Sequence, residues 1–287
     1  MGINEEPTQL KPNDYASDQE VRWCPGCGDY AILNAVKKSL ADMQAKKENT
    51  VFVSGIGCSS RLPYYMDTYG FHTIHGRAPA FATGIKLTNP ELDVWIITGD
   101  GDALSIGGNH FIHLLRRNLN CQILLFNNEI YGLTKGQASP ASRTGTVSPS
   151  TPSGSLESPM SACELALSSG ATFVARGVDT AIKQLVPTLN KAQEHVGTSL
   201  VEIFQNCIVY NDDVFKSFTD KSVAVDKQIH LENGKPMLFG ENNIKGLAIN
   251  KDYSALEVVD LEKNKKEISR VLIHNFKNKT IANLLTQ

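Results

Sequence analysis

The stretch VWIITGDGDALSIGGNH, residues 94–110, decides the fold of this chain. It opens on apolar and β-branched residues without alternation, which is typical of a parallel strand covered on both faces. The motif at 99–101 follows directly, and a second apolar strand expected at 122–126 ends at the Asn pair 127–128. Ligands in open α/β sheets gather beyond the carboxyl ends of the strands. These polar residues therefore mark a candidate site.

Strand and helix patterns alternate over the first 210 residues. Further strands are expected at 51–54, 72–75, 171–176 and 199–205, and helices at 29–43, 78–87, 107–117, 159–169 and 180–195. Such alternation predicts an α/β fold, with a mainly parallel sheet and helices on both faces.

Three parts are expected along the chain. Residues 1–20 read as an extended N-terminal arm, 21–210 as the main domain, and 211–287 as a polar C-terminal extension. The extension has weak strand signals and one amphipathic helix near 261–273. The segment 138–158 is crowded with Ser, Thr, Pro and Gly, and a loop that long is usually functional. It is expected to be a lid over the site or a contact to a partner subunit.

Composition argues against several classes of protein. The formal charge is −2, from 28 basic and 30 acidic residues, and this balance does not indicate a nucleic-acid-binding surface. No apolar run reaches the ~20 residues of a membrane span. The acidic, polar first 20 residues do not fit a secretory signal. Six cysteines without an export signal predict the reducing cytoplasm, where thiols act more often as ligands than as disulfides.

Asp100 and Asn128 follow two successive strands, and they lie side by side if those strands are adjacent in the sheet. Their side-chain oxygens, the backbone carbonyl of Ile130, phosphate oxygens and a water make the six-coordinate shell that Mg²⁺ prefers. The sequence therefore predicts Mg²⁺ bound to a diphosphate, with a tight turn and a capping aspartate as the alternative. The dinucleotide pattern G-x-G-x-x-G is excluded, because Leu104 stands where a small residue is needed.

Four cysteines have spacings that suit an iron–sulfur cluster. Cys24 and Cys27 form a C-x-x-C pair, and Cys58 and Cys207 follow. A C-x-x-C pair alone is also compatible with zinc or redox chemistry. A zinc ribbon would need a second such pair or two histidines, and none follows. The remaining two cysteines, at 121 and 163, are expected to be small core residues.

Five motifs in chain order give a more specific resemblance. They are WCPGCGDYAIL, GIGCSSRLPYY, HTIHGRAPAFATGIK, GDGDALSIGGNH and NNEIYGLTKGQASP. From about Arg22 to Tyr210 the chain resembles the β subunit of 2-oxoacid:ferredoxin oxidoreductases, most closely the 2-oxoglutarate type. The resemblance implies the thiamine-diphosphate-binding fold, with thiamine diphosphate, Mg²⁺ and a single [4Fe-4S] cluster as cofactors.

The resemblance also implies residue roles. Cys24, Cys27, Cys58 and Cys207 would hold the cluster, and Asp100, Asn128 and Ile130 the Mg²⁺. The thiamine diphosphate would be contacted by Ile56, Gly57, Cys58, Ser59, His75, Gly101, Asp102, Gly132 and Leu133. For His75 the alternative is a histidine that only satisfies a backbone carbonyl. Arg61 and Lys135 are candidates for holding a substrate carboxylate, with ordinary surface charge as the alternative.

The activity that the resemblance implies is a CoA-dependent oxidative decarboxylation of a 2-oxoacid, reversible in principle. The best candidate converts 2-oxoglutarate to succinyl-CoA and CO₂ and passes electrons through the cluster to ferredoxin. An α subunit, which in this family carries the activating glutamate, would be required in an αβ heterodimer or an (αβ)₂ assembly.

Other functions remain open at this stage. The same family includes β subunits for pyruvate or branched-chain 2-oxoacids. A non-redox thiamine-diphosphate decarboxylase subunit would need the metal motif but not the four thiolates. A zinc-stapled assembly protein without catalysis would leave Asp100 and Asn128 unexplained. The preferred 2-oxoacid, the electron carrier and the direction of flux do not follow from the sequence.

Overall fold

The computed structural model describes residues 9–286, and the chain forms two compact units. The first ends at Asp213 and the second begins at Val214. Of the predicted arm at 1–20, residues 1–8 lie outside the described part of the chain. No helix within 9–286 combines the length and the apolar character that crossing a bilayer requires.

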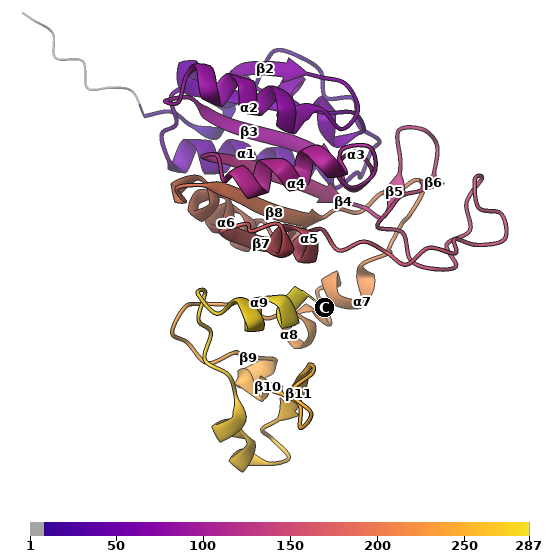
Figure 1. Cartoon of the computed structure of the whole chain (residues 1–287), viewed down its shortest axis with the longest axis vertical. Coiled ribbons are helices and arrows are strands. Elements are labelled where there is room, and N and C mark those ends of the chain that lie inside the picture. The colour runs from indigo at the N-terminus through magenta and orange to yellow at the C-terminus, as the bar shows by residue number, and fades with distance from the viewer. Residues whose placement is uncertain (1–8, 287) are drawn as a thin grey trace, which may run out of the picture. The chain divides into compact units, whose positions relative to one another are not determined.

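A six-stranded sheet forms the centre of the first unit (Figure 1). All its pairings are parallel, in the order β2-β1-β3-β4-β8-β7. The strands are β1 (Thr50–Ser54), β2 (Tyr69–His72), β3 (Asp93–Gly99), β4 (Cys121–Asn127), β7 (Phe173–Val178) and β8 (Thr198–Phe204). The two strands that precede the Asp100 and Asn128 motifs, β3 and β4, are neighbours, which is the condition that the expected metal site requires.

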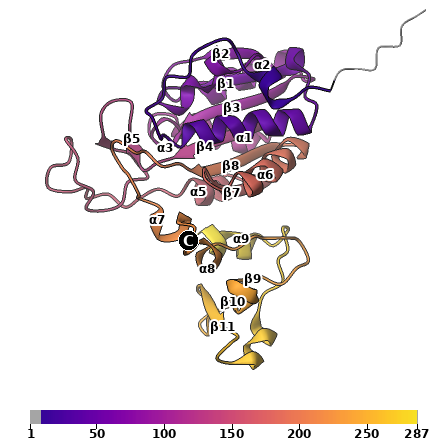
Figure 2. The ribbon, with the colours of Figure 1, turned by 180° about the vertical axis from the view of Figure 1, so that it is seen from behind.

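Helices cover both faces of this sheet. The helices are α1 (Asp29–Asp42), α2 (Ala78–Thr88), α4 (Gly108–Arg117), α5 (Ala162–Ser168) and α6 (Ile182–Glu194). Helices α1 and α6 pack on one face, as Figure 2 shows, and α2 and α4 on the other, as Figure 1 shows. Each face buries its own hydrophobic core against the sheet. The predicted α/β class, with helices on both faces, is confirmed.

The described part of the predicted arm packs against the first unit. It contains a 3-10 helix, Pro12–Tyr15, whose last side chain is fully buried. The Tyr15 hydroxyl lies 3.1 Å from the carbonyl of Leu40 and 2.7 Å from that of Ala45. Burial of an aromatic ring with a satisfied hydroxyl holds this segment against the end of α1.

Short elements near the site were not expected from the sequence. Helix α3 (Asp100–Leu104) begins directly at the end of β3. Strands β5 (Ile130–Tyr131) and β6 (Gln137–Ala138) form a two-stranded antiparallel hairpin. Strand β2 ends at His72, where the sequence predicted a strand to begin. Elements of two to five residues carry too little periodicity to be recognised from sequence.

The second unit is built on a three-stranded antiparallel sheet. Its elements are α7 (Lys216–Thr219), α8 (Ala224–Lys227), β9 (Leu238–Phe239), β10 (Lys245–Ile249), β11 (Leu256–Asp260) and α9 (Lys279–Thr286). The amphipathic helix predicted near 261–273 is wrong, because only a 3-10 helix, Lys265–Arg270, forms there. The backbone of Leu272 instead bonds to Leu247 and Met237, and this sheet-like pairing competes with a helix.

Candidate functional site

Asp100 and Asn128 meet at the carboxyl edge of the sheet. Strands β3 and β4 run side by side, with Gly99 opposite Phe126, so the residues that follow each strand become neighbours. Burial raises the pKa of Asp100 to about 7, while hydrogen bonds from Ser139 and from the backbone of Asn128 oppose the rise. Burial disfavours the ionised carboxylate, and a bound cation would compensate for this cost, so Asp100 is suited to bind a cation.

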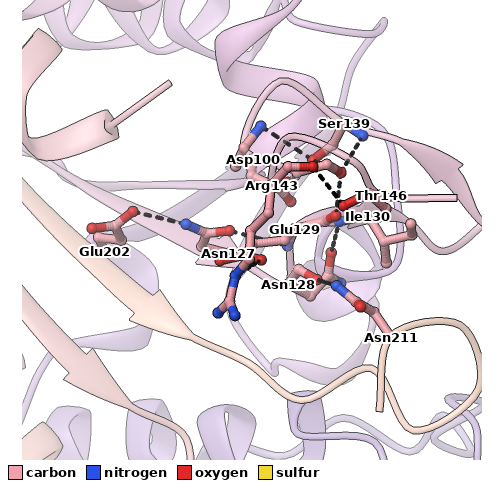
Figure 3. A network of polar contacts seen from close by, with 12 residues as sticks. Asp100, Asn127, Asn128, Glu129, Ile130, Ser139, Arg143, Thr146, Glu202 and Asn211 are labelled. Atoms are coloured by element: carbon pink, nitrogen blue, oxygen red, sulfur yellow. Dashed lines mark hydrogen bonds and ion pairs between the residues drawn. The ribbon is translucent and has the colours of Figure 1, made fainter. Parts of the chain in front are cut away.

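Asn128 is held in one orientation. Its Oδ1 accepts a 3.2 Å hydrogen bond from the backbone N–H of Ile130, and its Nδ2 donates to Gln205 Oε1 at 2.8 Å. The Asn211 amide donates to the Asn128 carbonyl at 2.8 Å (Figure 3). The Ser139 hydroxyl contacts Asp100 from the other side, as the same view shows. Hard oxygen ligands of the kind that Mg²⁺ takes are thus fixed close together.

A cavity opens at this edge of the sheet. The predicted residues that line it are Ile56, Gly57, Cys58, Ser59, His75, Asp100, Gly101, Asp102, Asn128, Ile130, Gly132 and Leu133. They come from segments that lie far apart in sequence, and the parallel sheet brings these segments together at one edge. Asp29, Phe126, Tyr131 and Gln205 also line the cavity and were not named as site residues from the sequence.

Asp102 joins two loops and the end of strand β3 beside the cavity. It is 3% exposed, and its Oδ1 accepts hydrogen bonds from the backbone N–H groups of Ile56 (3.1 Å) and Gly76 (2.7 Å). His75 Nδ1 lies 2.5 Å from the same oxygen, and the Thr98 hydroxyl donates to Oδ2 at 2.7 Å. The carboxylate therefore fixes the loop that follows β1 and the ring of His75. The direct role of Asp102 in the structure is to hold the cavity wall.

Gly101 allows the chain to pack closely at the floor of the cavity. A Cβ atom on this residue would lie 2.2 Å from the ring of Tyr131, well inside contact distance. The Tyr131 hydroxyl donates to the Gly101 carbonyl at 3.1 Å. The backbone of α3 can pack against Tyr131 only because no side chain occupies this position.

Cys24, Cys27, Cys58 and Cys207 gather beside the cavity. The backbone N–H of Cys27 donates to the carbonyl of Cys24 at 3.0 Å, which closes a turn. A Cβ on Gly132 would lie 3.5 Å from Cys207 Sγ and 3.6 Å from Cys58 Sγ. Burial, with smaller contributions from the charges of Asp29, Cys207 and Cys24, raises the pKa of Cys58 to about 12. Burial likewise raises the pKa of Cys27.

The thiols fit a cluster better than a single ion. Within residues 9–286, no three His, Cys, Asp or Glu side chains are close enough to hold one metal ion. The pKa of Cys58 is nevertheless affected by Cys24 and Cys207, and that of Cys27 by Cys58 and Cys207, so the four thiols lie near one another. A cluster places its iron atoms between the thiolates and spreads them further apart than one ion does. Cationic iron would also stabilise thiolates that burial disfavours.

Asp29 faces the same region. It is fully buried and lines the cavity, and neither carboxyl oxygen has a hydrogen-bond partner of normal geometry among the described residues. Burial raises its pKa to about 7, and the neighbouring Cys27 thiol moderates the rise. A buried carboxylate whose contact is a neighbouring thiol alone leaves hydrogen-bonding capacity that a bound group can use. The cavity and the thiols together therefore fit a cofactor and a cluster.

The other predicted residues lie outside the cavity lining. Arg61 is half-buried, and its Nε donates to the Tyr65 hydroxyl at 3.1 Å. Lys135 is exposed and has a positive φ of 77°. Cys121 and Cys163 are buried in the core, where Cys163 Sγ donates to Glu202 at 3.2 Å.

Comparison with known proteins identifies the family. Residues 55–203 match the family model described as the C-terminal TPP-binding domain of thiamine pyrophosphate enzymes. The 2-oxoacid:ferredoxin oxidoreductase β subunit of a Sulfolobus species is 45% identical over 70% of this chain and 67% of its own length. The chain belongs to this family of β subunits.

Two further similar proteins have names that specify 2-oxoglutarate. The 2-oxoglutarate oxidoreductase subunit KorB of Mycobacterium tuberculosis is 56% identical over 84% of this chain. A solved 2-oxoglutarate:ferredoxin oxidoreductase from Magnetococcus marinus, with 2-oxoglutarate, coenzyme A and succinyl-CoA bound, is 42% identical, with a TM-score of 0.72 over 75% of each chain. The chain spans only 64% of the length of the M. tuberculosis relative.

Proposed function

We propose that this chain is the β subunit of a 2-oxoglutarate:ferredoxin oxidoreductase that binds thiamine diphosphate, Mg²⁺ and one [4Fe-4S] cluster. The reaction is the CoA-dependent oxidative decarboxylation of 2-oxoglutarate to succinyl-CoA and CO₂, with ferredoxin as electron acceptor. The observation that carries the proposal is the position of four cysteines beside a cavity that Asp100 and Asn128 line.

Each group has residues that fit it. Asp100, Asn128 and the carbonyl of Ile130 would hold Mg²⁺, and the cavity lining would hold the thiamine diphosphate. The thiolates of residues 24, 27, 58 and 207 would hold the cluster. When bound, thiamine diphosphate supplies the chemistry that cleaves the 2-oxoacid, and the cluster accepts electrons. The chain's own part is to bind the groups side by side and to exclude water between them.

The size of the cavity supports a partner subunit. Its volume is about 120 Å³. Sites for drug-sized ligands enclose roughly 300–1,000 Å³. This chain therefore supplies one wall of the site, and the α subunit of the family would cover the rest in an αβ or (αβ)₂ assembly. A glutamate from that subunit would activate the cofactor.

Arg61 and Lys135 remain candidates for holding the distal carboxylate of 2-oxoglutarate. Neither Arg61 nor Lys135 lines the cavity. Replacement of Arg61 by Ile should reduce turnover of 2-oxoglutarate much more than that of pyruvate. Equal losses with both substrates would remove Arg61 from the role.

Metal analysis of the purified αβ complex tests the proposal. We expect iron and acid-labile sulfide in equal amounts, with thiamine diphosphate and turnover of 2-oxoglutarate. Cys207→Ser should lose most of the iron, whereas the control Cys121→Ser, at a buried thiol in the core, should retain it. The proposal fails if the iron stays with the partner subunit after separation, or if both variants keep the same iron content.

The alternative within the same family is a β subunit for pyruvate or a branched-chain 2-oxoacid. The cavity lining does not select the substrate. Parallel assays with 2-oxoglutarate, pyruvate and a branched-chain 2-oxoacid on one preparation decide between them.

A further inference from the structure

Gln205 lies between the two halves of the candidate site, which are the expected cation ligands around Asn128 and the cysteines around Cys27. It follows β8 directly, is 1% exposed and lines the cavity. Its backbone N–H donates to the carbonyl of Asn127 at 2.8 Å, which continues the pairing of β8 with β4 by one residue. The side chain therefore starts from a rigid strand end.

Both ends of the Gln205 amide are used. The Oε1 atom accepts the 2.8 Å hydrogen bond from Asn128 Nδ2. The Nε2 atom donates to Cys27 Sγ at 3.3 Å and to the carbonyl of Asn206 at 2.6 Å. The reverse orientation would set the Gln205 oxygen against the Asn206 carbonyl and its NH₂ against that of Asn128. Only one orientation of the amide therefore satisfies its neighbours.

This orientation decides which atom of Asn128 is available to a cation. Because Asn128 Nδ2 points at Gln205, Oδ1 points the other way, toward the backbone N–H of Ile130. An asparagine turned over would offer NH₂ where a cation needs oxygen. Partners behind a metal ligand that fix its orientation commonly change metal affinity 10- to 100-fold when they are removed.

The Nε2 end of the Gln205 amide donates a hydrogen bond to the sulfur of Cys27. An N–H that points at a cysteine sulfur stabilises negative charge there, and the reduced form of a cluster carries one more negative charge than the oxidised form. Hydrogen bonds to the sulfurs are among the factors that set cluster potentials. Removal of this donor should therefore make the cluster harder to reduce.

We propose that Gln205 is a positioning residue shared by both halves of the site, which presents Asn128 Oδ1 to the divalent cation and tunes the cysteine-bound cluster through Cys27. This inference rests on the proposed function. One side chain then joins the cation at the cofactor diphosphate to the electron acceptor, and its loss affects both.

The test uses the intact αβ complex and the variant Gln205→Met, which keeps the length of the side chain but neither donates nor accepts. Gln205→Asn is a second variant, because its shorter amide cannot reach both partners. The matched control is Gln122→Met, since Gln122 is an equally buried amide near the opposite end of β4. The readouts are the cluster midpoint potential, from a redox titration followed by electron paramagnetic resonance, and the affinity for Mn²⁺ in place of Mg²⁺.

For Gln205→Met we expect about a tenfold smaller equilibrium constant for reduction, which is about 59 mV more negative for a one-electron couple. We also expect about tenfold weaker Mn²⁺ binding. Gln205→Asn should shift at least one of the two values in the same direction, and it is the deciding variant if Gln205→Met does not fold. Gln122→Met should leave both values unchanged.

Two failures are distinguishable. If the wild-type complex holds the cluster and thiamine diphosphate but the folded Gln205 variant keeps both wild-type values, the role of Gln205 is refuted alone. Equal shifts in the Gln122 control refute it as well. If the wild-type complex holds no cluster on this chain, the proposed function fails and the role of Gln205 with it.

Discussion

Replacement of Asp102 by Asn tests how the loops of the cavity are held. The wild-type carboxylate accepts from two backbone N–H groups, those of Ile56 and Gly76, and from the Thr98 hydroxyl. It also contacts His75 Nδ1. Asparagine has nearly the same shape, so the substitution removes the negative charge without opening a cavity.

The size of the effect follows from these contacts. A hydrogen bond to a charged group contributes about 1.5–3 kcal/mol net, against about 1 kcal/mol for a neutral pair. Asparagine keeps one acceptor oxygen, so the bonds on Oδ1 weaken and the one at Thr98 must reverse. Summed over the contacts of Asp102, we expect the free energy of unfolding to fall by about 2–4 kcal/mol.

Urea unfolding at pH 7, followed by circular dichroism, measures this change in the αβ complex and in any form of the chain that folds alone. The control is Asp67→Asn, because Asp67 is exposed and makes one surface ion pair with Lys47. Surface pairs of this kind contribute about 0–1 kcal/mol. If Asp102→Asn is no more destabilising than Asp67→Asn, the carboxylate does not hold the loops.

Two further predictions concern the metal site and pH. Ser139→Ala removes the hydroxyl that contacts Asp100, and we expect about tenfold weaker Mg²⁺ binding, measured by calorimetry in the complex. The control Ser150→Ala, in an exposed loop, should bind Mg²⁺ as the wild type does. Equal Mg²⁺ affinities for the wild type and both variants would contradict the role of Ser139. Burial raises the pKa of Asp93, so the folded chain holds its proton more tightly than the unfolded chain, and wild-type stability should fall as pH rises from the ordinary aspartate pKa through the raised one. The Asp93→Asn variant cannot titrate at this position, so urea midpoints from about pH 4 to 7 should show the wild type losing stability relative to the variant. A difference in urea midpoint that stays constant over this pH range would show that Asp93 has an ordinary pKa.

The main architecture was readable from the sequence because long apolar runs and helical periodicity report burial directly. The strands around Ile96 and Leu124 are apolar on both faces, a pattern that is typical of a covered parallel strand. The α-helix expected near 261–273 failed because backbone pairing of Leu272 with the small sheet overrides local periodicity. Tertiary contacts of that kind leave no local signal.

The candidate site was partly readable for the same reason. Residues directly after strands, such as Asp100 and Asn128, could be placed at one edge from the strand pattern alone. Gln205 follows a strand in the same way, and the rule would have found it. Asp29 and Tyr131 could not be found so easily, because one begins a helix and the other lies in a two-residue strand.

The pairing of β4 with β8 has a consequence for biosynthesis. Cys24 precedes every strand of this sheet, whereas Gln205 and Cys207 follow its last strand, β8. Among the described residues, strand β7 pairs with β8 alone, so it has no place in the sheet until β8 has been made. The four thiols can therefore come together only after every strand of the sheet has been synthesised.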